Sequence, residues 1–309
     1  MQDSAVSYLR HGQTPFFRLP ASLDVANAHV ALLGVPHDGG TTYQPGARLA
    51  PYHVRRVSAL IQNHHPVHDV DVFTRLRCVD AGNIVFPPFD RAAMRSSIEA
   101  EIRQLVAGEV TPLVVGGDHS ITLPVLRALT KRIGPVAIIH FDAHLDMSGP
   151  EVWSDDFHHG TPMRHAIDEG LVQRGQLYQI GIRGSRATAG DDALARSQQH
   201  TLMTSDDIGY HGVKRICSEL RERIDTRPVY ITFDVDAVDP AFAPGTGTPV
   251  PGGLTAREAI GLLRGLAGID VRGGDVVEVC PALDHADITS HLAAHLLWEM
   301  LALIALRQS

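Results

Sequence analysis

The segment DAHLD at residues 142–146 has the strongest potential for chemistry in this chain, because it places two carboxylates and an imidazole at alternate positions. Divalent cations bind this mixture of oxygen and nitrogen donors. Two further polar clusters, DVD at 234–236 and GGDH at 116–119, also follow apolar runs. The pattern predicts one cation site built from three segments of the chain.

The apolar runs before these clusters must position them. Residues 113–115, 136–141 and 229–233 are typical of buried strands, and further strands are predicted at 30–33, 177–182 and 276–279, with a weaker one at 78–79. Helical periodicity predicts helices at 91–107, 121–132, 212–224, 256–267 and 290–306. Thr255 and Glu258 form a capping box for the fourth helix. Alternating strands and helices predict a parallel sheet, which binds its ligands at the carboxyl ends of the strands.

Carboxylates gathered at one sheet edge would repel one another and raise one another's pKa values. A bound cation keeps such groups ionised together. The alternative is that these are solvated loop carboxylates that cap helices. Three clusters at corresponding strand ends favour the cation.

Composition limits the class of protein. The chain has 309 residues and no linker or repeat, which predicts a single domain over residues 1–309. A net charge of -8 disfavours nucleic acid and anionic membrane surfaces as partners. Three cysteines cannot form a fully paired framework, and residues 1–15 contain no apolar signal segment, so we expect a cytoplasmic protein.

The apolar run at 292–306 is interrupted by His295 and Glu299, which predicts a core helix and not a membrane span. His291, His295 and Glu299 share one face of this helix. We expect that face to be a polar surface or a subunit contact, since no strand end presents it. The glycine-rich loops at 34–40 and 245–249 lack nucleotide-binding fingerprints and are predicted to wrap round the metal site.

Over nearly its whole length the chain resembles the ureohydrolase family, which includes arginases, agmatinases and guanidino-acid hydrolases. The shared motifs are GGDHS at 116–120, DAHLD at 142–146, HGT at 159–161, FDVDAVDP at 233–240, GTGTP at 245–249, GGL at 252–254 and EVCP at 278–281. The resemblance implies a three-layer α/β/α fold with a mostly parallel sheet of about eight strands. It also implies a homotrimer or homohexamer that cleaves a guanidino group to urea and an amine.

The resemblance further implies a binuclear Mn²⁺ site, for which Ni²⁺ is an alternative because the ligands are identical. One ion would bind His119, Asp142, Asp146 and Asp234. The other would bind His144, Asp236 and the same Asp142 and Asp234, which would therefore bridge the two ions.

Three residues are predicted to act on the substrate. Asp146 would also accept a hydrogen bond from the attacking water, Glu278 would pair with the guanidinium, and His159 would pass protons to the departing amine. Glu278 could instead form a structural ion pair, and His158 could take the place of His159. Hydrogen-bonding roles away from the ions are expected for the remaining nearby candidates, which are His140, His165, Asp118 and Asp239.

The substrate is less defined. Residues 147–157 contain no Asn or Thr of the kind with which arginases grip an α-amino acid, so arginine is disfavoured and the agmatinase branch is expected. Agmatine is favoured, because the loop after Asp146 carries three acidic residues, Glu151, Asp155 and Asp156. Three arginines, Arg164, Arg183 and Arg186, could equally bind a carboxylate, as in 4-guanidinobutyrate, 3-guanidinopropionate or proclavaminate hydrolases.

Two further substrate and function classes stay open. Cys280 replaces the usual Asn or Ser of this family and could indicate a biguanide or alkylguanidine substrate. A non-catalytic subunit of a mixed oligomer is the remote alternative, and it would lack a ligand. All six predicted ligands are present.

Overall fold

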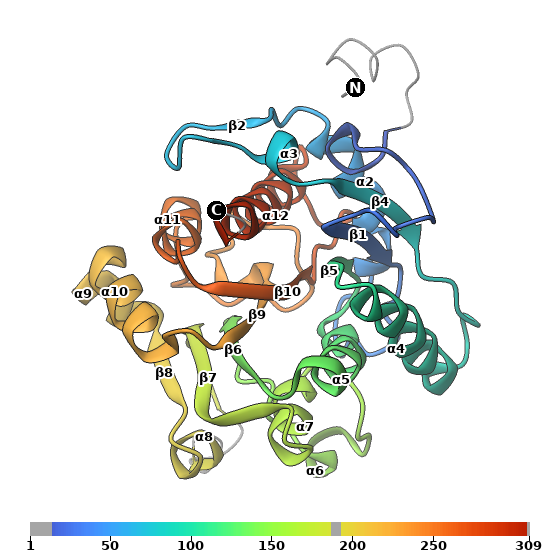
Figure 1. The fold of residues 1–309 in the computed structure, drawn as a ribbon. Helices are drawn as coiled ribbons and strands as arrows, with labels where there is room; N and C mark the ends of the chain where they lie inside the picture. Colours follow the sequence, from blue (N-terminus) through green and yellow to red (C-terminus); the bar gives the residue numbers. More distant parts are fainter. Residues whose placement is uncertain (1–13, 187–192, 308–309) are drawn as a thin grey trace.

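A computed structural model describes residues 14–186 and 193–307 and contains an eight-stranded sheet in which every pair of neighbours is parallel (Figure 1). The strands are β1 (Val30–Val35), β4 (Cys78–Asn83), β5 (Thr111–Gly116), β6 (Val136–Phe141), β7 (Val172–Ile182), β8 (Thr201–Thr204), β9 (Pro228–Asp234) and β10 (Asp270–Val277). Their order is β4-β1-β5-β10-β9-β6-β7-β8. A separate hairpin pairs β2 (His64–His65) with β3 (Val70–Asp71).

Helices cover both faces of the sheet (Figure 1). One apolar core includes side chains of α2 (Ala50–Ser58), α9 (Ser205–His211), α10 (Val213–Ile224), α11 (Ala256–Gly265) and α12 (Ile288–Arg307). The core on the other face includes α4 (Arg91–Ala107), α5 (Thr122–Ile133) and α7 (Pro162–Asp168). The predicted three-layer α/β/α architecture is confirmed. Short helices complete the described chain: α3 (Val72–Arg75), α6 (Pro150–Trp153) and α8 (Ala193–Ser197).

Most predicted elements are present with small changes at their ends, and the capping box of Thr255 and Glu258 is formed. Strand β7 begins at Val172 and not at residue 177, and strand β10 begins at Asp270 and not at residue 276. Gly273 and Gly274 lie inside it and reduced its strand-like character in the sequence. A Cβ on Gly274 would lie 2.7 Å from the Ile231 carbonyl oxygen, so close packing requires glycine there. The short edge strand β8 and the helices α2, α7 and α9 were not predicted.

Helix α12 is, among the described helices, the one long and apolar enough to cross a membrane by length and composition. In the fold, 83% of its apolar window is buried, which confirms the predicted core helix. Glu299, on the predicted polar face of α12, is buried. It is 1% exposed, its Oε1 accepts a hydrogen bond from Arg264 Nε at 2.8 Å, and its Oε2 lies 2.9 Å from His65 Nε2. Apolar packing tolerates this carboxylate because both of its oxygens are paired.

Candidate metal centre

Three turns at the carboxyl edge of the sheet hold the predicted ligands. Asp142 directly follows β6, Asp234 ends β9, and His119 begins a 3-10 turn after β5. Each of the turns is fixed by a local side-chain bond: Asp118 accepts from Ser120 N at 3.0 Å, Asp142 from His144 N at 2.6 Å, and Asp234 from Asp236 N at 2.8 Å. These short polar side chains favour a turn because they bond the backbone two residues ahead.

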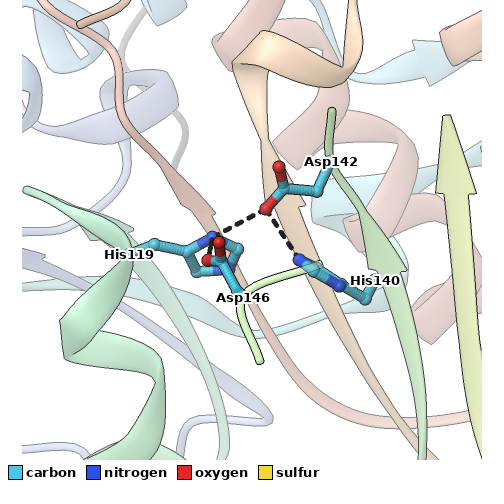
Figure 2. A group of neighbouring side chains, drawn as sticks. All are labelled: His119, His140, Asp142 and Asp146. Atoms are coloured by element: carbon cyan, nitrogen blue, oxygen red, sulfur yellow. Dashed lines mark hydrogen bonds and ion pairs between the residues drawn. The ribbon is translucent and has the colours of Figure 1, made fainter. Parts of the chain in front are cut away.

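The first group of side chains surrounds the imidazole of His119. Its Nδ1 lies 2.9 Å from Asp146 Oδ2, 3.1 Å from Asp142 Oδ2 and 3.4 Å from Asp234 Oδ2. Figure 2 shows the Asp142 carboxylate between the rings of His119 and His140. The structure therefore brings together the four residues predicted for one ion.

The second group surrounds His144. Its Nδ1 lies 3.0 Å from Asp236 Oδ2 and 3.3 Å from Asp142 Oδ1. The other oxygen of Asp236 accepts from Ala143 N at 3.0 Å. Because the two oxygens of Asp142 face the two histidines separately, Asp142 joins the two groups. The His144 side chain is 39% exposed, whereas that of His119 is 1% exposed, so the second group lies nearer to solvent.

The carboxylates and imidazoles of the two groups shift one another's pKa values. Burial, together with the charges of Asp236 and Asp142, raises the pKa of Asp234 well above its usual range. Burial and Asp142 raise the pKa of Asp236 in the same direction. Burial lowers the pKa of His144, but Asp236 and Asp142 outweigh burial and raise it to about 12. The negative charges of the carboxylates therefore favour protonation of the neighbouring groups. A bound divalent cation would supply the positive charge instead.

His119 supplies a direct test of whether the residues fit a metal. Its Nε2 lies 2.8 Å from Thr232 Oγ1, so this nitrogen already has a hydrogen-bond partner. Its Nδ1 is buried and has no hydrogen-bond partner, although three carboxylates surround it. A histidine that bonds through one nitrogen and presents the other to carboxylates is the arrangement of a metal ligand. The nitrogen and oxygen donors suit Mn²⁺ or Ni²⁺.

Two site residues have strained backbones. Asp146 has φ 51° and Glu278 has φ 63°, in the left-handed region that non-glycine residues seldom occupy. Such conformations cluster at functional sites, where surrounding contacts enforce them. The backbone carbonyl of Asp146 accepts from Met163 N at 3.0 Å, so the start of α7 fixes this loop.

Glu278 and His159 meet beside the first group. Glu278 is 1% exposed, and its Oε1 lies 3.0 Å from His159 Nδ1 and accepts from His119 N at 2.9 Å. The other ring nitrogen of His159 lies 2.8 Å from Thr42 Oγ1. His158 is turned to its own loop, since its Nδ1 accepts from Gly160 N at 3.1 Å. Of the two neighbouring histidines, His159 contacts Glu278.

A pocket of about 490 Å³ lies over these groups. His144, Asp146 and Asp234 form part of its floor, and Thr42 and His159 stand beside them. Its wall includes Glu151, Trp153, Arg164 and Arg186. The pocket therefore offers a small polar ligand the carboxylates and histidines of the two groups together with charged side chains.

Comparison with known proteins gives a concordant result. The model of the arginase family matches residues 28–302. The chain is 42% identical to the proclavaminate amidinohydrolase of Streptomyces clavuligerus, over 97% of this chain and 95% of that protein. It is also 42% identical to a guanidinopropionase of Pseudomonas aeruginosa, over 95% of this chain and 92% of that protein.

The chain belongs to the arginase family. The solved structure of the Streptomyces clavuligerus enzyme superposes with a TM-score of 0.91 at 41% identity, and the match covers 95% of this chain and 97% of that one. As an arginase-family protein, the chain is an amidinohydrolase, and the predicted ureohydrolase resemblance is confirmed.

The structure also reveals contacts of the arginase-family site that sequence reasoning missed. Thr42 contacts His159, Thr232 contacts His119, and Gln179 contacts His140. Each partner is distant in the sequence, and no local motif marks it. The strand positions of Thr232 and Gln179 were the available clue, because a polar residue inside an apolar strand needs a partner.

Several charged residues near the predicted site are used elsewhere. Arg183 donates to the backbone carbonyls of Val250, Ala237 and Asp236 and so ties loops together. Asp155 pairs with Arg91. Arg183 and Asp155 are two of the residues that the sequence predicted to bind the tail of the substrate.

Proposed function

We propose that this protein hydrolyses the guanidino group of a small guanidino carboxylic acid to urea and an amine. The supporting observation is the pocket over the two ligand groups, which is lined by Arg164 and Arg186. Arg164 Nε also donates to Asp168 Oδ2 at 2.7 Å, and Arg186 donates to the Arg183 carbonyl oxygen at 2.9 Å. Arginine binds carboxylates through its planar donors. Among the described lining residues beyond the predicted ligands, Glu151 is the one acidic side chain. The guanidinopropionase relative acts, by its name, on such an acid.

The proposed centre holds two Mn²⁺ ions, with Ni²⁺ as the alternative. His119, Asp142, Asp146 and Asp234 would hold one ion, and His144 and Asp236 would join the shared aspartates at the other. When bound, such a pair of ions lowers the pKa of water to near neutrality and orients it. A guanidinium carbon is a poor electrophile because its charge is delocalised, so its hydrolysis requires activation of this kind.

The chain's own residues complete the reaction. Asp146 lines the pocket and would accept a proton from the attacking water. His159 would protonate the departing amine through Nε2, since Nδ1 is held by Glu278. In the structure Nε2 accepts from Thr42 N at 3.3 Å, so the proton transfer requires this nitrogen to turn from Thr42 to the substrate. Glu278 does not line the pocket, and its Oε1 is used by His159 and His119. The predicted contact with the guanidinium would therefore be made by Oε2.

Agmatine remains the second candidate, because Glu151 lines the pocket and could bind a free amine. The structure weakens the argument for agmatine that rests on the acidic loop after Asp146. Asp155 is paired with Arg91, and its Oδ1 accepts from Phe157 N at 2.9 Å. Arg164 is likewise paired, with Asp168, so pairing alone does not rank the two substrates. The guanidino acid moves ahead of agmatine in our proposal because the guanidinopropionase relative is 42% identical to this chain, whereas the agmatinase of Photorhabdus laumondii is 38% identical.

A substrate panel tests the order. Urea release should be compared by specificity constant for 3-guanidinopropionate, 4-guanidinobutyrate, agmatine, L-arginine, guanidine and a biguanide. We expect a guanidino acid to lead and arginine to be poor. Arg164→Gln should raise KM for guanidino acids and spare agmatine, whereas the control Arg103→Gln, on the exposed part of α4, should change neither. Agmatine in first place, unaffected by Arg164→Gln, would contradict the proposal, and Glu151 would then become the residue to test.

A further inference from the structure

A row of polar side chains crosses the middle of the sheet one layer beneath the ligands. Thr232 on β9 pairs in register with His140 on β6, and His140 pairs with Gln179 on β7. All three are 0% exposed. Side chains two positions apart on a strand share a face. Thr232 therefore lies directly below Asp234, and His140 lies directly below Asp142.

Two members of the row contact a ligand from below. Thr232 Oγ1 lies 2.8 Å from His119 Nε2, and His140 Nε2 lies 2.8 Å from Asp142 Oδ2. Asp142 Oδ2 is also the oxygen that faces His119 Nδ1. The row thus sets the orientation of the carboxylate that joins the two ligand groups.

Gln179 determines which nitrogen of His140 carries the proton. Its Nε2 donates to the Leu145 carbonyl oxygen at 2.7 Å and lies 2.9 Å from His140 Nδ1. A carbonyl oxygen can only accept, so the amide nitrogen must face this way and its second hydrogen points to His140. Nδ1 of His140 therefore accepts, and Nε2 carries the proton that is donated to Asp142. A protonated Nε2 cannot itself bind a metal, although it lies close to the ligand atoms.

The glutamine is held in this position at a cost. Its Oε1 is buried and has no hydrogen-bond partner. An apolar residue of similar size would fill the same space without burying an unpaired oxygen. Packing therefore does not account for a glutamine in the centre of the sheet, whereas its contacts with the Leu145 carbonyl oxygen and with His140 do.

We propose that Gln179 is a positioning residue for the metal centre, acting through His140 to hold Asp142 in its bridging orientation. This inference rests on the proposed function, because it requires that Asp142 bind metal. Partners that orient a ligand in this way typically contribute about 10- to 100-fold to metal affinity.

The test measures the dissociation constant for Mn²⁺ by competition with a fluorescent chelator, using metal-free full-length protein. Gln179→Met and His140→Met should each weaken binding about 10- to 100-fold. His140→Gln, which keeps an N–H donor near the position of Nε2, should restore most of the affinity. Tyr178→Phe is the matched control, because it removes a hydroxyl from the same strand that bonds Gln176, and its affinity should equal that of the wild type.

Circular dichroism of the metal-free variants keeps the test decisive. If Gln179→Met fails to fold, the comparison of His140→Met with His140→Gln decides, since the two side chains are similar in size and differ in the donor. Wild-type affinity in folded Gln179→Met, or equal losses in both His140 variants, would overturn this inference and leave the proposed metal centre intact. A wild-type protein that binds no Mn²⁺ would overturn both the inference and the proposed metal centre.

Discussion

Replacing His159 by alanine should change how the stability of the metal-free protein depends on pH. The His159 side chain is 12% exposed, and its Nδ1 lies 3.0 Å from Glu278 Oε1. Burial lowers the pKa of His159, but the Glu278 carboxylate, with Asp146 and Asp118, outweighs burial and raises it from 6.5 to about 9. Because the folded-state pKa exceeds the unfolded value, the charged imidazole stabilises the fold fully below pH 6.5. That contribution is lost as the pH rises through about 9.

The magnitude follows from the size of the shift. Raising a pKa from 6.5 to about 9 corresponds to roughly 3 kcal/mol of folding free energy, at about 1.4 kcal/mol per pKa unit. The stability difference between wild type and His159→Ala should therefore be largest near pH 6 and should shrink by about this amount towards pH 10. With Mn²⁺ bound, the same variant should lose about 100- to 10,000-fold in kcat if His159 acts as the general acid.

Urea unfolding at a series of pH values measures the effect. His200→Ala is the control: burial lowers the pKa of His200 to about 4, and its Nδ1 accepts from Leu177 N. His200 is therefore neutral in both states between pH 7 and 10, so the curve of His200→Ala should run parallel to that of the wild type. A His159→Ala curve parallel to the wild type over the same range would refute the ion pair with Glu278.

Three further outcomes are expected. Asp142→Asn should abolish turnover and release both metals, because Asp142 joins both ligand groups, whereas His159→Ala should keep both metals. Metal analysis after dialysis checks this, and two ions retained by Asp142→Asn would contradict the prediction. Removing metal with a chelator should lower the melting temperature, and Mn²⁺ at about 100 times its Kd should restore roughly 2.7 kcal/mol. Thr255→Ala should destabilise the protein by about 1 kcal/mol in urea with activity unchanged, because it removes the acceptor that caps α11.

The sequence alone predicted most of the long elements and the meeting of three polar clusters, while the choice of ligands among them came from the resemblance to the ureohydrolases. Helix α4 has the predicted bounds of residues 91–107, because its apolar spacing and the Asp90 cap are local features. The meeting of the clusters was predictable because parallel strands bring their carboxyl ends to one edge of a sheet, so DAHLD and DVD had to meet there. Resemblance to the ureohydrolases added the division of these residues between two ions.

Only the tertiary structure decided how distant groups pair. Glu278 and His159 are 119 positions apart, and His65 reaches Glu299 across 234 positions. No periodicity encodes such contacts, since they depend on loop paths and on helix packing. The partners of the charged residues near the pocket were likewise decided by the fold: Arg183 donates to backbone carbonyls, whereas Arg164 lines the pocket and pairs with Asp168.

The polar row beneath the ligands separates what the sequence predicts from what only the tertiary structure decides. The sequence places Gln179 and His140 in strands, but only strand order and register place β7 beside β6 with these two residues opposite each other. A shift of one residue would turn each side chain to the other face of the sheet. Register is fixed by packing over the whole sheet, and so the partner of His140 follows from the fold and not from its local sequence.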